Sequence, residues 1–279
     1  MAMLGYEARM MRVLDHIHDN PASDLRLDTL ADIAAMSRFH WHRVYAAMMG
    51  ETCAETVRRI RLHRASVWLV QNEWPLAQVA AACGYPNPRS FSRAFADHYG
   101  LPPATFRRRG ALAAPFPHTP KGVATMFPVE IETHPERRIV ALPHNGAYHE
   151  IAKAFEKLSA TISARGLWPQ VRGMVAVFHD DITAVPEADL RSHAGFFVGD
   201  DVALPGGLEE LRIAAGRFAM LRYRGPYSGL MAGYTQLYGT WLPDSGEEAR
   251  DAPPFEIYRN SPMDTAPDDL LTDICVPLV

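Results

Sequence analysis

Cysteine is scarce in this chain of 279 residues, and long apolar runs are absent. The three cysteines, Cys53, Cys83 and Cys275, are odd in number and far apart, which supports neither a disulfide framework nor a zinc site. No segment approaches the roughly 20 apolar residues that span a bilayer. The first residues also lack the charged-then-apolar layout of a secretion signal. We therefore expect a cytoplasmic protein without a membrane partner, whose cysteines are reduced.

The short motifs of common catalytic and cofactor sites are missing as well. There is no Ser-His-Asp order, no glycine loop that cradles phosphate and no nucleotide-binding fingerprint. The run His179-Asp180-Asp181 has the residue types of a metal site, but it follows a predicted strand, where solvated loop acids are the common case. We expect no metal, no cofactor and no enzymatic activity.

Lysine is absent from residues 1–110, which hold fourteen arginines and ten acidic residues. The remaining residues hold fourteen basic and twenty-two acidic residues, so the chain's net charge of −4 conceals a basic part and an acidic part. Such a division is typical of a nucleic-acid-binding module joined to a module with a different partner.

The basic part contains an internal repeat. Residues 37–45 and 87–95 share an aromatic, Arg, aromatic pattern, and each copy continues to a glycine, Gly50 or Gly100. In front of each copy the spacing predicts a short helix, at 30–35 and at 76–82, and Ser37 and Asn87 are expected to cap the helices that follow. The result is two helix-turn-helix units. Apolar spacing also predicts helices over 6–18 and 54–70, the latter roughly 25 Å long at about 1.5 Å per residue.

The second helix of each unit has a buried stripe of aromatic residues and an outer face that carries arginine. Arginine can pair with guanine in the major groove of DNA, and a helix of the predicted length between the units could set them about 34 Å apart, one turn of B-DNA. The alternative is an ordinary solvated helix face. Finding the pattern twice favours the DNA interpretation.

Residues 7–109 resemble the DNA-binding domain of the AraC/XylS family of bacterial transcription regulators. The resemblance is carried by the following residues: Cys83-Gly84-Tyr85, Ser90-Phe91-Ser92-Arg93, Phe95, Gly100, Pro102-Pro103 and Phe106-Arg107. It implies an operator-DNA partner. The implied base-reading positions are Phe39, His42 and Arg43 in the first unit and Arg89, Ser90 and Arg93 in the second.

After a proline-containing stretch at 111–126, which we interpret as a linker, residues 127–279 form a second repeat with an offset of 79 to 80. Each copy is predicted to be strand, strand, helix, strand, strand. Two such units predict one α+β domain with an antiparallel sheet and a pseudo-twofold groove. We therefore expect a multidomain chain: an all-α double helix-turn-helix over 1–110, and a duplicated α+β domain over 127–279.

The two copies differ at Glu256, which takes the place of Ala176. On a strand, Glu256 shares a face with Tyr258, while Phe255 and Ile257 face the other way. A carboxylate among aromatic rings favours a cationic ligand. The alternative is an exposed glutamate on an edge strand.

The second half resembles the GyrI-like effector-binding family. The resemblance is carried by the following residues: Arg224-Gly225-Pro226-Tyr227, Trp241-Leu242, 255–262, Thr272-Asp273-Ile274 and Pro277. It implies that Glu256 contacts effectors that are often flat, aromatic and cationic, so that the effector is expected to be aromatic, cationic or both. The implied aromatic lining is Tyr148, Phe178, Tyr227, Trp241 and Tyr258.

Together the two resemblances imply a transcription regulator that responds to a small effector. They leave open whether the linker or contact with RNA polymerase transmits the response. Two alternatives of other classes remain: the C-terminal domain could hydrolyse strained electrophilic rings, with Glu256 activating water, or it could be a gyrase-inhibitor-like protein-binding module.

Overall fold

The computed structural model describes residues 5–110, 127–182, 184–262 and 264–279. The predicted linker over 111–126 lies outside the described residues. The chain divides into two compact units, one of residues 1–36 and 49–120, the other of residues 37–48 and 121–279. Residues Ser37–Met48, which contain the whole first copy of the predicted DNA-reading repeat (37–45), thus cluster with the C-terminal half.

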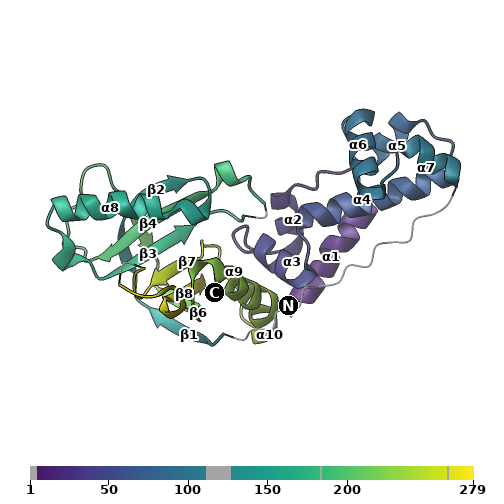
Figure 1. Cartoon of the computed structure of the whole chain (residues 1–279). Coiled ribbons are helices and arrows are strands. Elements are labelled where there is room, and N and C mark those ends of the chain that lie inside the picture. Colours follow the sequence, from purple (N-terminus) through teal and green to yellow (C-terminus); the bar gives the residue numbers. More distant parts are fainter. Residues whose placement is uncertain (1–4, 111–126, 183, 263) are drawn as a thin grey trace. The chain divides into compact units, whose positions relative to one another are not determined.

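The first unit is helical (Figure 1). Its helices are α1 (Tyr6–Asp19), α2 (Leu27–Ala34), α4 (Cys53–Gln71), α5 (Leu76–Ala82), α6 (Pro88–Tyr99) and α7 (Pro103–Arg109). Helices α5, α6 and α7 surround the C-terminal part of α4, and their shared core includes Leu62, Leu69, Phe91, Phe95 and Phe106. The helical fold predicted for this part of the chain is confirmed.

In the second helix-turn-helix unit, the start of α6 and the turn before it are specified by the local sequence. The Asn87 side chain accepts a hydrogen bond of 2.8 Å from the Ser90 amide, and Pro88 is the first helical residue of α6. Both features suit a helix start, where a side-chain acceptor satisfies a free amide and proline loses no hydrogen bond. In the turn before them, Gly84 has a φ of +73°, and a Cβ there would lie 2.9 Å from the Pro21 carbonyl oxygen. The turn therefore requires glycine.

Two other helix starts were harder to place from the sequence. Helix α4 begins at Cys53, because Thr52 and Glu55 form a reciprocal capping box. Helix α3 (Trp41–Met49) begins later than a cap at Ser37 implies. The amides of His40 and Trp41 both bond to the Ser37 carbonyl oxygen, so the residues between form a tighter turn that precedes the helix.

The C-terminal half forms one eight-stranded antiparallel sheet. Its strands are β1 (Val129–His134), β2 (Arg137–Asn145), β3 (Gly173–Phe178), β4 (Arg191–Val198), β5 (Glu209–Ile213), β6 (Gly216–Arg224), β7 (Phe255–Tyr258) and β8 (Leu271–Pro277). The helices between them are α8 (Ala152–Ala164), α9 (Leu230–Gln236), a π-helical stretch (Leu237–Trp241) and α10 (Leu242–Ser245). Single 3-10 turns occur at Tyr148–Glu150, Trp168–Gln170, Glu187–Asp189, Tyr227–Gly229 and Pro267–Asp269. The predicted duplicated α+β fold is confirmed.

The strand order, β1-β6-β8-β7-β3-β4-β2-β5, reveals an exchange between the two copies. The first strand of each copy pairs with the second strand of the other copy, β1 with β6 and β5 with β2. At the centre, β3 pairs with β7. Because each copy completes the other's half of the sheet, the halves form a single folding unit.

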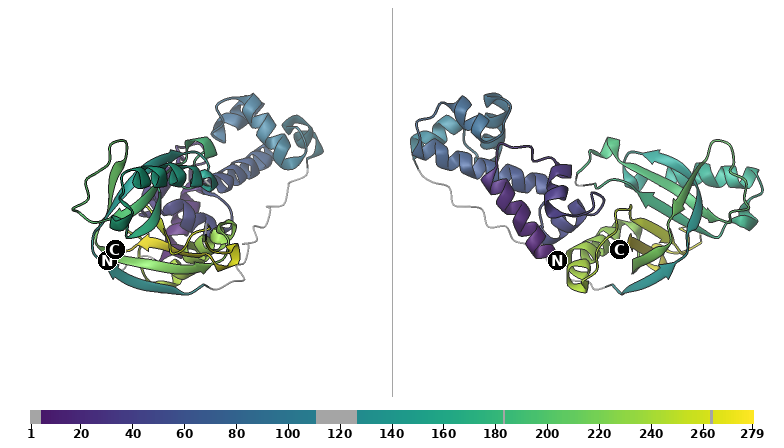
Figure 2. Two further views of the ribbon diagram at one scale, coloured as in Figure 1. Left: turned by 60° about the vertical axis from the view of Figure 1, so that its left-hand side comes forward. Right: turned by 180° about the vertical axis from the view of Figure 1, so that it is seen from behind.

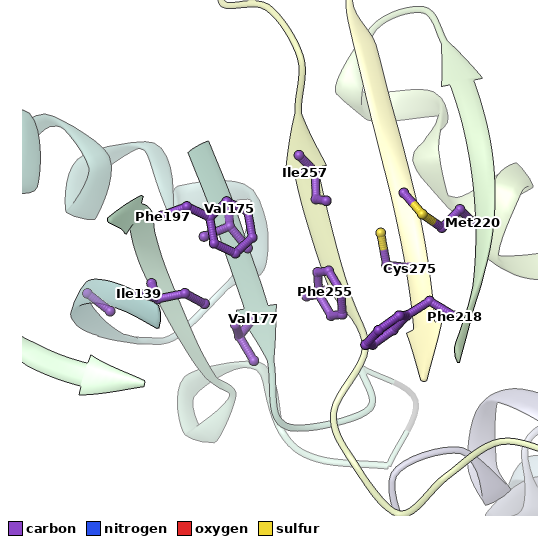
Figure 3. Packing of buried hydrophobic residues seen from close by; sticks show 10 residues of the cluster. Ile139, Val175, Val177, Phe197, Phe218, Met220, Phe255, Ile257 and Cys275 are labelled. Atoms are coloured by element: carbon purple, nitrogen blue, oxygen red, sulfur yellow. The ribbon is translucent and has the colours of Figure 1, made fainter. Parts of the chain in front are cut away.

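The two faces of this sheet have separate roles. One face is a continuous apolar core that includes Ile139, Val175, Phe218, Phe255 and Ile257, whose side chains project from strands of both copies (Figure 3). Helix α8 packs on β2 and β4, and α9 packs on β6; two further views show the strands and helices of this half from other sides (Figure 2). The face that carries Glu256 lies opposite the core of Phe255 and Ile257.

Two expectations about the whole chain can be compared with the described residues. All three cysteines are buried and form no disulfide. Within the described ranges, every helix is too short or too polar to cross a membrane.

Candidate functional site

Glu256 lies in the middle of the sheet and is almost fully buried. Strand β7, which carries it, is flanked by β3 and β8, and only 4% of the residue is exposed. The interpretation of an exposed glutamate on an edge strand is therefore wrong. Its two carboxylate oxygens accept hydrogen bonds from the hydroxyl groups of Tyr234 (2.9 Å) and Tyr258 (2.8 Å).

Burial governs the acid–base behaviour of this group. Removal from water raises the pKa of Glu256, while the hydrogen bonds from Tyr258 and Tyr234 and the charge of Arg43 partly oppose that increase. Burial and the nearby carboxylate also raise the pKa values of Tyr234 and Tyr258 well above their ordinary value. The phenols consequently remain donors, and the site presents an acceptor that a cation would stabilise in its charged form.

The position of Glu256 marks the pseudo-twofold centre of the sheet. In the β3–β7 pair its direct cross-strand partner is Ala176, its counterpart in the other copy. The substitution that distinguishes the two copies thus lies where they meet.

Aromatic rings from both copies lie near this centre. Tyr227 packs edge-on against Tyr258 at 5.4 Å, and Phe155 does so at 5.7 Å from the opposite copy. Tyr148 lies 4.8 Å from Phe178. Tyr148, Phe178, Phe155 and Tyr258 all belong to, or pack against, one apolar cluster that contains Ala176.

Trp241 is the exception among the predicted lining residues. It ends the π-helical stretch and is half-buried, and no ring contact within the described chain joins it to the other five. The structure therefore brings together Glu256, Tyr148, Phe178, Tyr227 and Tyr258 but leaves Trp241 outside this set of contacts.

Tyr234 is a member of the site that the sequence did not single out. It lies on α9, and its hydroxyl is one of the two donors to Glu256. A signal was present, because Tyr234 is the repeat counterpart of Phe155. The copy that gained a carboxylate at Glu256 also has a hydroxyl on this ring.

The run His179-Asp180-Asp181 is used for structure and for contact with the site. The Asp180 carboxylate pairs with Arg191 at 2.7 Å, and His179 Nε2 lies 2.8 Å from His193 Nδ1. The Asp180 carbonyl oxygen accepts a hydrogen bond of 2.9 Å from the Tyr148 hydroxyl. This loop therefore fixes the position of one of the predicted effector-contacting rings.

Three of the predicted DNA-contacting residues belong to the second helix-turn-helix unit and lie on the first two turns of α6. Arg89 and Arg93 are exposed, and Ser90 is half-buried and bonded to the Asn87 carbonyl oxygen. All three line a recess that also includes Arg58 and Arg61. The described residues give this surface a concentration of positive charge suited to phosphates and guanine edges.

The predicted DNA-contacting residues of the first helix-turn-helix unit are arranged differently. Phe39 lies in the turn before α3, with the Arg38 guanidinium 4.9 Å from its ring. His42 and Arg43 are half-buried on α3. The Arg43 guanidinium donates hydrogen bonds to the carbonyl oxygens of Phe39 (2.5 Å) and Asp180 (2.8 Å).

Comparison with known proteins gives two family matches. A model described as a GyrI-like small molecule binding domain matches residues 127–279, and one described as a helix-turn-helix domain matches residues 30–109. The bifunctional transcriptional activator/DNA repair enzyme AdaA of Bacillus subtilis (strain 168) is 31% identical over 100 residues, which are 36% of this chain and 47% of AdaA. The chain thus spans about half the length of AdaA.

Two further similarities cover different parts of the chain. The probable transcription factor PqrA of Proteus vulgaris is 30% identical over 88 residues, which are 32% of this chain and 72% of PqrA. The structure of an EcmrR–DNA complex in EcmrR-RPo aligns with a TM-score of 0.47 and 17% identity, over 55% of this chain and 57% of that one.

Proposed function

The chain belongs to the family with a GyrI-like small molecule binding domain, joined here to an AraC-type helix-turn-helix domain, and we propose that it is a transcription regulator controlled by a small aromatic cation. In this proposal residues 1–110 bind operator DNA and residues 127–279 bind the effector at Glu256. The effector must bind the DNA-competent and DNA-incompetent states with different affinities, because otherwise it cannot shift their equilibrium.

The observation that carries the effector proposal is the buried carboxylate of Glu256. In the described chain no Lys, Arg or His forms an ion pair with it, although both oxygens accept hydrogen bonds from phenols. A buried charge that no cation contacts directly is costly. The charge of Arg43 offsets only part of that cost, and a bound cation would offset more of it. The rings of Tyr227 and Tyr258 add attraction for a cation and surface for a flat ligand.

The DNA-binding proposal depends on the exposed arginines of α6. A footprint across the genome would identify the operator, after which Arg93→Ala can be compared with Arg12→Ala, a change of an exposed arginine on α1. We expect Arg93→Ala to weaken specific binding by about 1 to 3 kcal/mol and to relax the preference at one base pair. Equal weakening across all sequences would instead indicate a phosphate contact.

The effector proposal has a matched test. In a reporter assay with the identified operator, Glu256→Gln should abolish the response to a cationic effector and leave operator affinity in its absence unchanged. An unchanged response would refute Glu256 as the effector site.

The raised pKa of Glu256 also favours a second candidate, hydrolysis of a strained electrophile with Glu256 as general base. Incubation of the full chain with an epoxide, followed by product analysis, separates the two functions. A sensor returns the compound unaltered, whereas an enzyme gives a diol whose formation requires Glu256.

A further inference from the structure

The side chain of Arg43 reaches the site of Glu256 from a segment outside the C-terminal sheet. Ser37–Met48 belongs to the same compact unit as residues 121–279. Arg43 Nη2 donates to the Asp180 carbonyl oxygen at 2.8 Å. The same oxygen accepts the hydroxyl of Tyr148, a predicted effector-contacting residue, at 2.9 Å.

Aromatic rings continue the contact from Arg43 to the carboxylate. The guanidinium carbon of Arg43 lies 6.0 Å from the centre of the Tyr238 ring. Tyr238 stacks on Tyr234 at 6.3 Å with an interplanar angle of 7°, and Tyr234 donates to Glu256. A flat cation with hydrogen-bond donors thus lies beside Tyr238 and the Asp180 carbonyl oxygen, next to the proposed effector site, and its charge acts on Glu256.

Other contacts hold the segment in this position. The buried His40 ring bonds to the Tyr238 hydroxyl and to the Arg250 carbonyl oxygen, both at 2.9 Å. Ala47 packs so closely on the π-helical stretch that a Cβ on Gly239 would lie 2.8 Å from the Ala47 Cβ. The guanidinium is therefore presented by an anchored segment.

We propose that Arg43 is an internal ligand of the effector site: its guanidinium occupies the subsite for the cationic group of the effector, and amidinium- or guanidinium-bearing aromatic ligands compete with it. This inference rests on the proposed function of Glu256 and specifies the ligand class of that site. It also specifies how the ligand acts, because Arg43 is one of the predicted base-reading residues and cannot occupy both positions. A ligand that displaces it makes the first recognition helix available to DNA.

Competition of this kind lowers the apparent affinity for an external ligand. When only a fraction of the molecules has the subsite open, the apparent dissociation constant rises by the reciprocal of that fraction. If Arg43 fills the subsite in nine molecules of ten, its removal should tighten binding about 10-fold.

The test uses benzamidine, a flat aromatic cation, and benzamide, its neutral analogue, in calorimetric titrations of the full chain. We expect benzamidine to bind the Arg43→Gln variant about 10-fold more tightly than the unaltered chain. Benzamide should bind both proteins more weakly than benzamidine does, because it lacks the charge that Glu256 would stabilise. Arg38→Gln, which changes an exposed arginine of the same segment, is the matched control and should leave benzamidine affinity unchanged.

A second variant acts without altering any charge. Gly239→Ala introduces a methyl group against Ala47 and weakens the anchoring of the segment, while alanine suits the helical backbone better than glycine. It should increase benzamidine affinity in the same direction as Arg43→Gln. Agreement of the two variants would exclude a local effect of either substitution.

The outcomes separate this inference from the proposed function. If benzamidine binding depends on Glu256 but Arg43→Gln leaves it unchanged or weakens it, Arg43 is no competitor and the inference is overturned, while the effector site stands. Absence of binding to both the unaltered chain and Arg43→Gln also overturns it. If Glu256→Gln binds benzamidine as well as the unaltered chain, the proposed effector site itself is refuted.

Discussion

Replacement of Glu256 by glutamine should stabilise the ligand-free protein at neutral pH. Glutamine has nearly the same shape and can keep both hydrogen bonds: its carbonyl oxygen accepts from one tyrosine hydroxyl, and its amide group donates to the other. What it removes is the charge of the carboxylate. Because only 4% of Glu256 is exposed, water solvates that charge poorly. The cost of that charge is what the comparison measures.

The direction of this change in stability follows from the raised pKa of Glu256, whose ordinary value is 4.5. Because the folded state holds the proton more tightly than the unfolded state, the carboxyl group's contribution to stability falls as pH rises from 4.5 through the folded-state pKa. It is constant outside that range. Each unit by which folding raises the pKa corresponds to about 1.4 kcal/mol of unfolding free energy lost at neutral pH.

The assay is urea unfolding of both proteins at pH 4 and pH 8. Relative to the unaltered chain, Glu256→Gln should gain stability between the two pH values, by about 1.4 kcal/mol or more if the pKa is raised by a unit or more. A difference between the proteins that is the same at both pH values would show that burial does not destabilise the carboxylate. The argument for a cation at this site would then lose its physical basis.

Two further predictions concern local interactions. Asn87→Ala should lower the unfolding free energy by about 1 kcal/mol in urea titrations, because the Ser90 amide loses its acceptor; Asn87→Asp keeps the acceptor and should cost little, and equal losses would refute the capping role. Burial, with a smaller effect of the nearby Arg43 charge, lowers the pKa of His40 to about 3 from 6.5. The unfolded state therefore binds the extra proton first, and His40 should lower stability by up to about 1.4 kcal/mol per unit as pH falls from 6.5 towards 3. If His40→Gln lost as much stability as the unaltered chain between pH 6.5 and pH 4, this assignment would be contradicted.

The opposite pH dependences of these groups have a common cause. Burial penalises the charged form of each, so Glu256 opposes folding at high pH and His40 opposes it at low pH. Both groups lie in the unit that contains the proposed effector site. His40 lowers stability below pH 6.5 and Glu256 lowers it above pH 4.5, so the two pH ranges overlap.

Much of the fold follows from interactions between residues close in sequence. Asn87 and Pro88 specify the start of α6 whatever packs against it, because a cap and a preset φ act within one turn. The alternation along β7 placed Glu256 and Tyr258 on one face and Phe255 and Ile257 on the other, and the structure agrees because side chains alternate on any strand. The repeat itself predicted the order of strands and helices in each half.

The site required information that local sequence does not contain. The local sequence of β1 does not predict that it pairs with β6 of the other copy. That pairing depends on which strand at the edge of the other half is free to accept it. For the same reason the Tyr234 hydroxyl, 22 residues from Glu256, could not be assigned as its donor.

The sequence by itself determined two duplicated modules, their helices and strands, and a single carboxylate that breaks the symmetry of the second. Only the tertiary structure decided that this carboxylate is buried between two phenols, that Trp241 lies apart from the ring contacts, and that the Arg43 side chain lies near Tyr238 and the Asp180 carbonyl. The physical reason is the distance along the chain over which each interaction acts. Capping and alternation act over a few residues, whereas burial and the partners of a charge depend on parts of the chain that meet only after folding.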